Sequence, residues 1–253
     1  MIGEEFASGD SFVHRIDPRL KIMVAVLFSI VIAVADRFPA LLCGLFFSIS
    51  LILIARLNIK KVFYRLLIVN GFILLLWVFL PFTFPGEELF SLGPLTASRE
   101  GVIYALLITV KSNTIVIASI GLLATSSITT LVHALRHVYV PEKLVHLFFF
   151  CYRYIHVIHL EYIRLTNAMK IRCFQPKTNI HTYKTYAYLV GMLLLRSYDR
   201  SERVYDAMLC RGFKGKFWML DHFSLKRSDM VSGTIMFLYI LGLVILQWRQ
   251  ILV

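Results

Sequence analysis

The segment LLIVNGFILLLWVFL, residues 66–80, decides the class of this protein because it contains no charged side chain. Four further runs are predominantly apolar, at residues 22–35, 40–55, 102–124 and 230–246. The chain is 58% hydrophobic and has a mean hydropathy of +0.72, whereas soluble domains are about 45–50% apolar. We therefore expect an all-α, polytopic membrane protein with about five transmembrane helices and additional long amphipathic helices.

Polar residues and prolines mark where these helices begin and end. Asp17 and Pro18 predict the start of the first helix, as an N-cap and first-turn pair. Pro81 is expected to end the run at 66–80. Lys111 and Asn113 interrupt the run at 102–124, where polar groups are costly in lipid. We expect these two residues to face the bundle interior, with a structural or subunit-interface role, and a place on a transport path is the alternative.

Residues 144–160 are apolar enough to suggest a sixth span, but they contain Arg153 and three histidines. An arginine at the middle of a bilayer costs about 2.5 kcal/mol or more. We therefore interpret this stretch as an amphipathic or partly embedded helix.

The basic residues predict the orientation. The net charge is +12, and 23 of the 27 lysines and arginines fall before the first run, between the second and third, or between the fourth and last. The positive-inside rule then places the N-terminus and the long segment before the last run in the cytoplasm, in a multi-pass protein of the cell inner membrane. The expected parts are a four-span bundle at 1–125, a cytoplasmic coupling region at 126–227 and a last span at 228–253. Because topology explains the charge and no binding module is present, no nucleic-acid partner is expected.

A short motif occurs twice in the cytoplasmic segment. Residues 167–174 (NAMKIRCF) and 206–213 (DAMLCRGF) share Ala, Met, Arg and Phe at an offset of 39 residues. Each alanine lies four residues before its arginine, so both share one helical face. Gly212 is expected to cap the second helix at its C-terminus. These candidate docking residues are Ala168, Arg172, Ala207, Arg211 and Gly212. The alternative is that both ends are solvated and their charges complement the helix dipole.

The sequence contains no complete catalytic or metal-binding motif. His133 with His137, and His156 with His159, have the spacing of neighbours on one helix face, but two nitrogens make an incomplete metal site. A phosphate-binding loop and a metalloprotease motif are both absent from the sequence. We expect no enzyme activity, no metal and no cofactor in this chain. A self-contained metal permease and an intramembrane protease are rival hypotheses. The apolar runs lack the polar groups that either function would need at membrane depth.

Three stretches of the chain carry a family resemblance, at residues 11–22, 125–143 and 201–213. With them the chain resembles the transmembrane T component of energy-coupling factor transporters, and most closely the CbiQ group associated with cobalt uptake. The resemblance implies two cytoplasmic ATP-binding subunits and a separate substrate-binding membrane subunit as partners. It also implies that Arg172 and Arg211 insert into grooves of the ATP-binding subunits, so that ATP-driven motion reaches the substrate-binding subunit.

The resemblance leaves two points open. Cys173 stands where the family pattern has glycine, which predicts that the first helix ends differently from the second. Cobalt is the expected substrate, but the same role in nickel or vitamin uptake is an alternative, because specificity would reside in another polypeptide.

Overall fold

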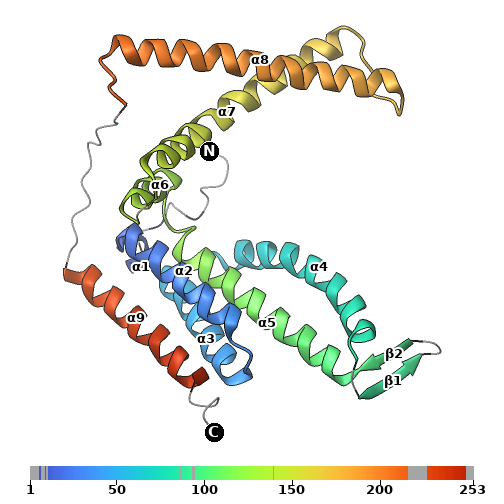
Figure 1. Cartoon of the computed structure of the whole chain (residues 1–253), viewed down its shortest axis with the longest axis vertical. Helices are drawn as coiled ribbons and strands as arrows, with labels where there is room; N and C mark the ends of the chain where they lie inside the picture. The colour runs from blue at the N-terminus through green and yellow to red at the C-terminus, as the bar shows by residue number, and fades with distance from the viewer. Residues whose placement is uncertain are drawn as a thin grey trace. The chain divides into compact units, whose positions relative to one another are not determined.

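The computed structural model describes residues 6, 9, 11–85, 87–92, 95–138, 140–215 and 227–248. Within them the chain is helical apart from one β-hairpin, and it divides into two compact units. The helices that belong to each unit can be followed in Figure 1. The all-α class expected from the apolar runs is confirmed.

The first unit holds the membrane-spanning helices. Its elements are α1 (Phe12–Arg15), α2 (Pro18–Val34), α3 (Phe38–Ala55), α4 (Ile59–Thr83), β1 (Glu88–Leu92), β2 (Leu95–Ser98), α5 (Arg99–Leu122), α6 (Ile128–His137) and α9 (Arg227–Trp248). The antiparallel β1–β2 hairpin, in which Leu92 pairs with Leu95, joins α4 to α5 and was not expected from the sequence. The amphipathic helix α6 packs against α2 within this unit.

All five apolar runs form helices. Four helices among the described residues are long and apolar enough to cross a membrane, at Phe38–Ala55, Ile59–Thr83, Arg99–Leu122 and Arg227–Gln247. Helix α2 has 17 residues, which is at the lower limit of the roughly 17–25 residues that span a bilayer. Helix α4 continues through Pro81 to Thr83, although Pro81 was expected to end it. Pro81 lacks a backbone N–H, but only the last residues of α4 follow it, so few helical hydrogen bonds are affected.

The core of the first unit lies where α2, α3 and α5 meet. Phe28 and Ile32 of α2, Leu41 of α3 and Leu122 of α5 are all completely buried. Helix α9 joins this core through Tyr239, whose hydroxyl donates to the Cys43 carbonyl oxygen at 2.8 Å. Apolar packing therefore fixes the bundle, and one polar contact helps to fix the register of α9.

The start of α2 is held by polar contacts. The Asp17 carboxylate accepts a hydrogen bond from the Arg19 backbone N–H at 2.9 Å, and Pro18 occupies the first turn, so the predicted N-cap pair is confirmed. The buried Lys21 ammonium donates to the Ser126 hydroxyl at 2.7 Å and to the Thr125 hydroxyl at 3.3 Å. These contacts attach α2 to the connection between α5 and α6.

Helices α4 and α5 approach closely at Gly101. A Cβ atom at this position would lie 2.7 Å from the Leu80 carbonyl oxygen and 2.9 Å from the Pro81 Cα atom. Both are backbone atoms that cannot move aside as a side chain can. Small residues commonly permit such close contacts between helices in membranes.

We expect Gly101→Ala to destabilise the protein by about 1–3 kcal/mol, because the added methyl group clashes with the α4 backbone. Gly242→Ala in α9 is the matched control, since a Cβ there meets nothing within 4 Å. Thermal unfolding of both variants in the same detergent measures the difference. Equal melting temperatures for the two variants would contradict the close approach.

The second unit consists of α7 (Glu142–Ile171) and α8 (Ile180–Cys210). Residues 144–160 form the first part of α7, and this helix is not one of the four candidate spans found among the described residues. Figure 1 shows α7 and α8 as two long helices that cross each other. Few of their side chains are buried: Val145 and Glu161 of α7, and Thr182 and Leu189 of α8.

Candidate functional site

The repeated motif forms the C-terminal ends of α7 and α8, and the two ends have the same hydrogen-bond pattern. At the end of α8, the Phe213 N–H donates to the Met208 carbonyl oxygen at 3.0 Å, and the Gly212 N–H donates to the Leu209 carbonyl oxygen at 2.9 Å. Gly212 has a φ of 81°, the left-handed conformation expected of a C-terminal cap. This pair of bonds is a Schellman motif, in which Met and Phe flank the cap and commonly touch.

The end of α7 repeats this arrangement residue by residue. The Phe174 N–H donates to the Met169 carbonyl oxygen at 3.1 Å, and the Cys173 N–H donates to the Lys170 carbonyl oxygen at 3.0 Å. Cys173 has a φ of 57°, so it takes the conformation that Gly212 takes in the second copy. The expectation that α7 ends differently is therefore wrong. The two hydrogen bonds hold the left-handed turn despite a steric cost of about 1–2 kcal/mol for a residue with a Cβ.

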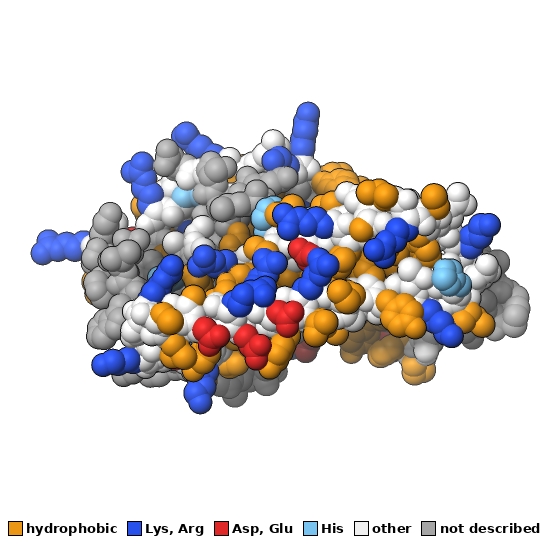
Figure 2. Space-filling view, turned by 90° about the horizontal axis from the view of Figure 1, so that it is seen from above, with side chains coloured by type: hydrophobic (Ala, Val, Ile, Leu, Met, Phe, Trp, Pro, Cys, Tyr) orange, Lys and Arg blue, Asp and Glu red, His pale blue; other side chains and the backbone are white. Residues whose placement is uncertain are grey.

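The arginine of each copy lies at the same position, immediately before the left-handed residue. Arg172 and Arg211 are both exposed, and no carboxylate among the described residues forms an ion pair with either of them. Ala168 and Ala207 are exposed one turn earlier. The two ends thus present the same small residue and the same guanidinium to solvent. Figure 2 shows basic side chains spread across one face of the molecule, with hydrophobic side chains between them.

Three other arginines of this unit have an internal partner. The Glu161 carboxylate on α7 pairs with Arg196 of α8, with Arg164 at 3.5 Å and with Arg200 at 4.0 Å. The hydrogen bond from Arg196 and the charges of all three arginines hold the pKa of Glu161 below its ordinary value of 4.5. Glu161 therefore holds α7 and α8 together where they cross, and its ion pairs do not include Arg172 or Arg211.

The two arginine-bearing ends lie far apart. Helix α8 has 31 residues, which at 1.5 Å per residue gives a length of about 45 Å. Arg172 shares a cavity of about 560 Å³ with His181 and Thr185 in the first turns of α8, whereas Arg211 ends the same helix. Phe174 packs edge-on against Tyr186 at a ring-centroid distance of 5.9 Å, which holds the end of α7 near the start of α8. The unit therefore offers two similar sites at opposite ends of one helix.

Comparison with known proteins identifies the family. The family model described as "Cobalt transport protein", CbiQ, matches residues 9–219. The chain belongs to the CbiQ family. It is 24% identical to the energy-coupling factor transporter transmembrane protein EcfT of Lactococcus lactis, over 99% of this chain and 98% of that protein. It is 23% identical to the EcfT protein of Thermosediminibacter oceani, over 83% of each chain. An uncharacterised protein of Methanocaldococcus jannaschii is 26% identical, over 90% of this chain and 80% of that protein.

The polar residues that interrupt α5 of this CbiQ-family chain form contacts inside the first unit. The Lys111 ammonium donates to the Asp36 carboxylate at 2.8 Å and to the Ala33 carbonyl oxygen at 3.1 Å. The side-chain amides of Asn113 and Asn70 donate to each other at 3.0 Å. These contacts favour a structural role for Lys111 and Asn113, because each joins α5 to a neighbouring element.

Sequence reasoning missed the partners in three of these contacts: Asn70, Asp36 and Glu161. Each is a lone polar or acidic residue within or next to an apolar stretch, which was the available signal. Among the described residues, no group of three or more His, Cys, Asp or Glu side chains is placed to hold a metal ion.

Exchanging the cap residues tests the matched helix ends. Cys173→Gly should stabilise the second unit by up to about 1 kcal/mol, because glycine takes the left-handed conformation without steric cost. Gly212→Cys should destabilise it by about 1 kcal/mol for the converse reason. Hydrogen exchange at the Phe174 and Phe213 amides measures both effects. Shifts of the same sign at the two positions would contradict the shared geometry.

Removing the charge of Glu161 tests the crossing of α7 and α8. Because its pKa is lowered, the carboxylate stabilises the crossing above its ordinary pKa of 4.5, and this contribution is lost as the pH falls through the lowered value. Glu161→Gln should therefore loosen the crossing at neutral pH and remove this acid dependence. Distances between spin labels on α7 and α8 measure the opening. Glu202→Gln, at an exposed position of α8, is the control and should behave as the unchanged protein does.

Proposed function

We propose that this chain is the transmembrane coupling subunit of an energy-coupling factor transporter. In this role it transmits the ATP-driven motion of two cytoplasmic ATP-binding subunits to a substrate-binding membrane subunit. Membership of the CbiQ family and the names of the EcfT relatives support the role. The observation that carries it is the pair of exposed arginines at matching ends of α7 and α8, which no carboxylate among the described residues engages.

Arginine suits such docking because its planar guanidinium is permanently charged and can form two parallel hydrogen bonds with a carboxylate. The capping turn fixes the backbone beside each arginine, so less conformational freedom is lost when a partner binds. In the proposed complex Arg172 and Arg211 bind corresponding grooves of the two ATP-binding subunits. Ala168 and Ala207 permit close approach one turn earlier, and Gly212 completes the second cap.

The proposed orientation places the N-terminus and the coupling region, residues 126–227, in the cytoplasm of a cell that holds the chain in its inner membrane. The distribution of lysine and arginine supports this orientation. The ATP-binding subunits supply the energy, because the sequence contains no phosphate-binding loop of its own.

We propose cobalt ion as the substrate, in line with the description of the family as a cobalt transport protein. The ion is bound by the substrate-binding subunit in this proposal. Uptake of cobalt and of nickel by cells that express the complete transporter distinguishes the two metals.

Charge reversal tests the docking sites. Arg172→Glu and Arg211→Glu together should lower ATP-driven uptake by about 30-fold or more. Each glutamate replaces a positive charge in the proposed binding groove with a negative charge, which repels a carboxylate there or is left without a partner. The ATP-binding subunits should also fail to copurify, while insertion into the membrane is unchanged. Arg203→Glu, at an exposed position of α8 outside both helix ends, is the matched control and should retain uptake. Normal uptake by the double variant would refute the proposed docking.

A further inference from the structure

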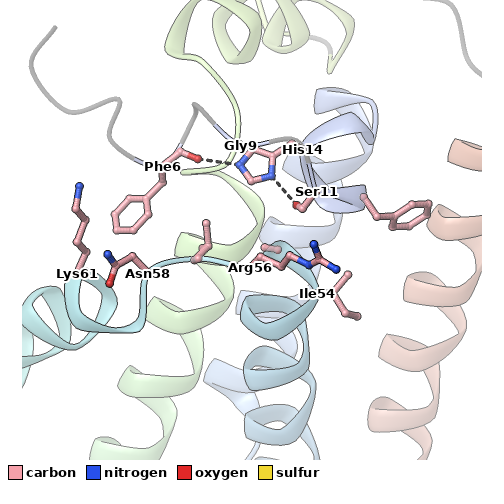
Figure 3. A pocket seen from close by; sticks show the side chains of 11 residues that line it. Phe6, Gly9, Ser11, His14, Ile54, Arg56, Asn58 and Lys61 are labelled. Atoms are coloured by element: carbon pink, nitrogen blue, oxygen red, sulfur yellow. Dashed lines mark hydrogen bonds between the residues drawn. The ribbon is translucent and has the colours of Figure 1, made fainter.

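The first unit contains a basic cavity that the proposed coupling role does not use. It has a volume of about 580 Å³ and lies where α1, the end of α3 and the start of α4 meet. Figure 3 shows Arg56, Asn58 and Lys61 on the α3–α4 side and His14 on the α1 side. None of the described residues that line this cavity is acidic.

The polar side of this cavity is ordered by local contacts. The His14 ring is held by the Ser11 hydroxyl at 2.6 Å and by the Phe6 carbonyl oxygen at 2.9 Å. The Asn58 side chain accepts from the Lys60 N–H at 3.1 Å and thereby caps α4. Arg56 ends α3 with a φ of 50°, and no carboxylate among the described residues pairs with it. The cavity therefore places an exposed cation beside a tight turn between two spanning helices.

A second cavity adjoins the basic one. It has a volume of about 650 Å³ and lies between α3 and α9, lined mainly by apolar side chains such as Phe46, Val231 and Met236. Phe12 and Ile54 line both cavities, so the two are neighbours. In Figure 3 the Arg56 guanidinium and Ile54 lie on the same side of the basic cavity. A cationic site thus lies next to an apolar groove along two spanning helices.

We propose that these two cavities together bind an anionic phospholipid. The phosphate group occupies the basic cavity against Arg56, and one acyl chain lies in the groove between α3 and α9. The charge of the lining matches a phosphate, and the groove matches a hydrocarbon chain. The site lies entirely in the first unit and does not depend on the proposed docking of ATP-binding subunits.

Arg56→Gly tests the headgroup site without endangering the fold, because glycine takes the left-handed conformation more easily than arginine. Lys60→Ala is the matched control: it removes the same charge from the nearby first turn of α4, but Lys60 lines neither cavity. Ser50→Trp fills the groove, and Leu53→Trp places the same ring on an exposed part of α3 outside both cavities.

The measurement is native mass spectrometry of the purified full chain titrated with dioleoyl phosphatidylglycerol or with dioleoyl phosphatidylcholine. We expect phosphatidylglycerol to bind more tightly than phosphatidylcholine. We also expect Arg56→Gly and Ser50→Trp each to weaken phosphatidylglycerol binding by about tenfold, with little change in the two controls.

Three results would overturn the proposal. The first is equal binding of the two lipids by the unchanged chain. The second is an equal loss in Arg56→Gly and Lys60→Ala, which would indicate attraction to general surface charge. The third is full displacement of phosphatidylglycerol by an equal concentration of inorganic phosphate, which would indicate an anion site that makes no use of the groove.

Discussion

The first unit depends on one constraint: hydrocarbon offers no hydrogen-bond partner, so every polar group within the bilayer must find one in the protein. Helices satisfy the backbone, and several polar side chains bond to a backbone carbonyl oxygen or to a side chain of a neighbouring helix. Ser48 of α3 donates to the Thr114 carbonyl oxygen of α5 at 3.1 Å, and Asn70 of α4 pairs with Asn113 of α5. Lipid does not favour one apolar surface of a helix over another. Such polar pairs therefore help to decide which helices are neighbours and in which register.

The second unit obeys a different constraint, because two crossing helices bury too little apolar surface to hold each other by packing alone. Charge pairing at Glu161 and the ring contact between Phe174 and Tyr186 supply fixed points instead. The same shortage of buried apolar surface explains the repeated motif. Met and Phe recur at fixed positions, and the backbone hydrogen bond between them ends each long helix at a defined residue without support from a surrounding core.

Much of this structure could be predicted from the sequence, and the failures have physical reasons. Apolar runs predicted the spanning helices because composition alone determines which segments lipid accepts. Gly212 and Asp17 were predictable because caps depend on neighbouring residues. The pairs of Lys111 with Asp36 and of Asn113 with Asn70 join residues far apart in the chain, so no local sequence pattern predicts them. The prediction based on Cys173 was wrong because residue type only biases a φ angle. The surrounding hydrogen bonds determined the left-handed φ of Cys173.

The position of the Glu161 contact along α8 has a mechanical consequence. Arg196 lies near the middle of Ile180–Cys210, so the contact divides α8 into two arms, each about 20–25 Å long. Equal forces applied at the two ends in the same direction exert opposing torques about this pivot and cancel as rotation, so they displace the helix as a whole. Unequal forces tilt it. Because the Glu161 contact lies near the middle of α8, the balance of the two loads determines whether the helix translates or rotates.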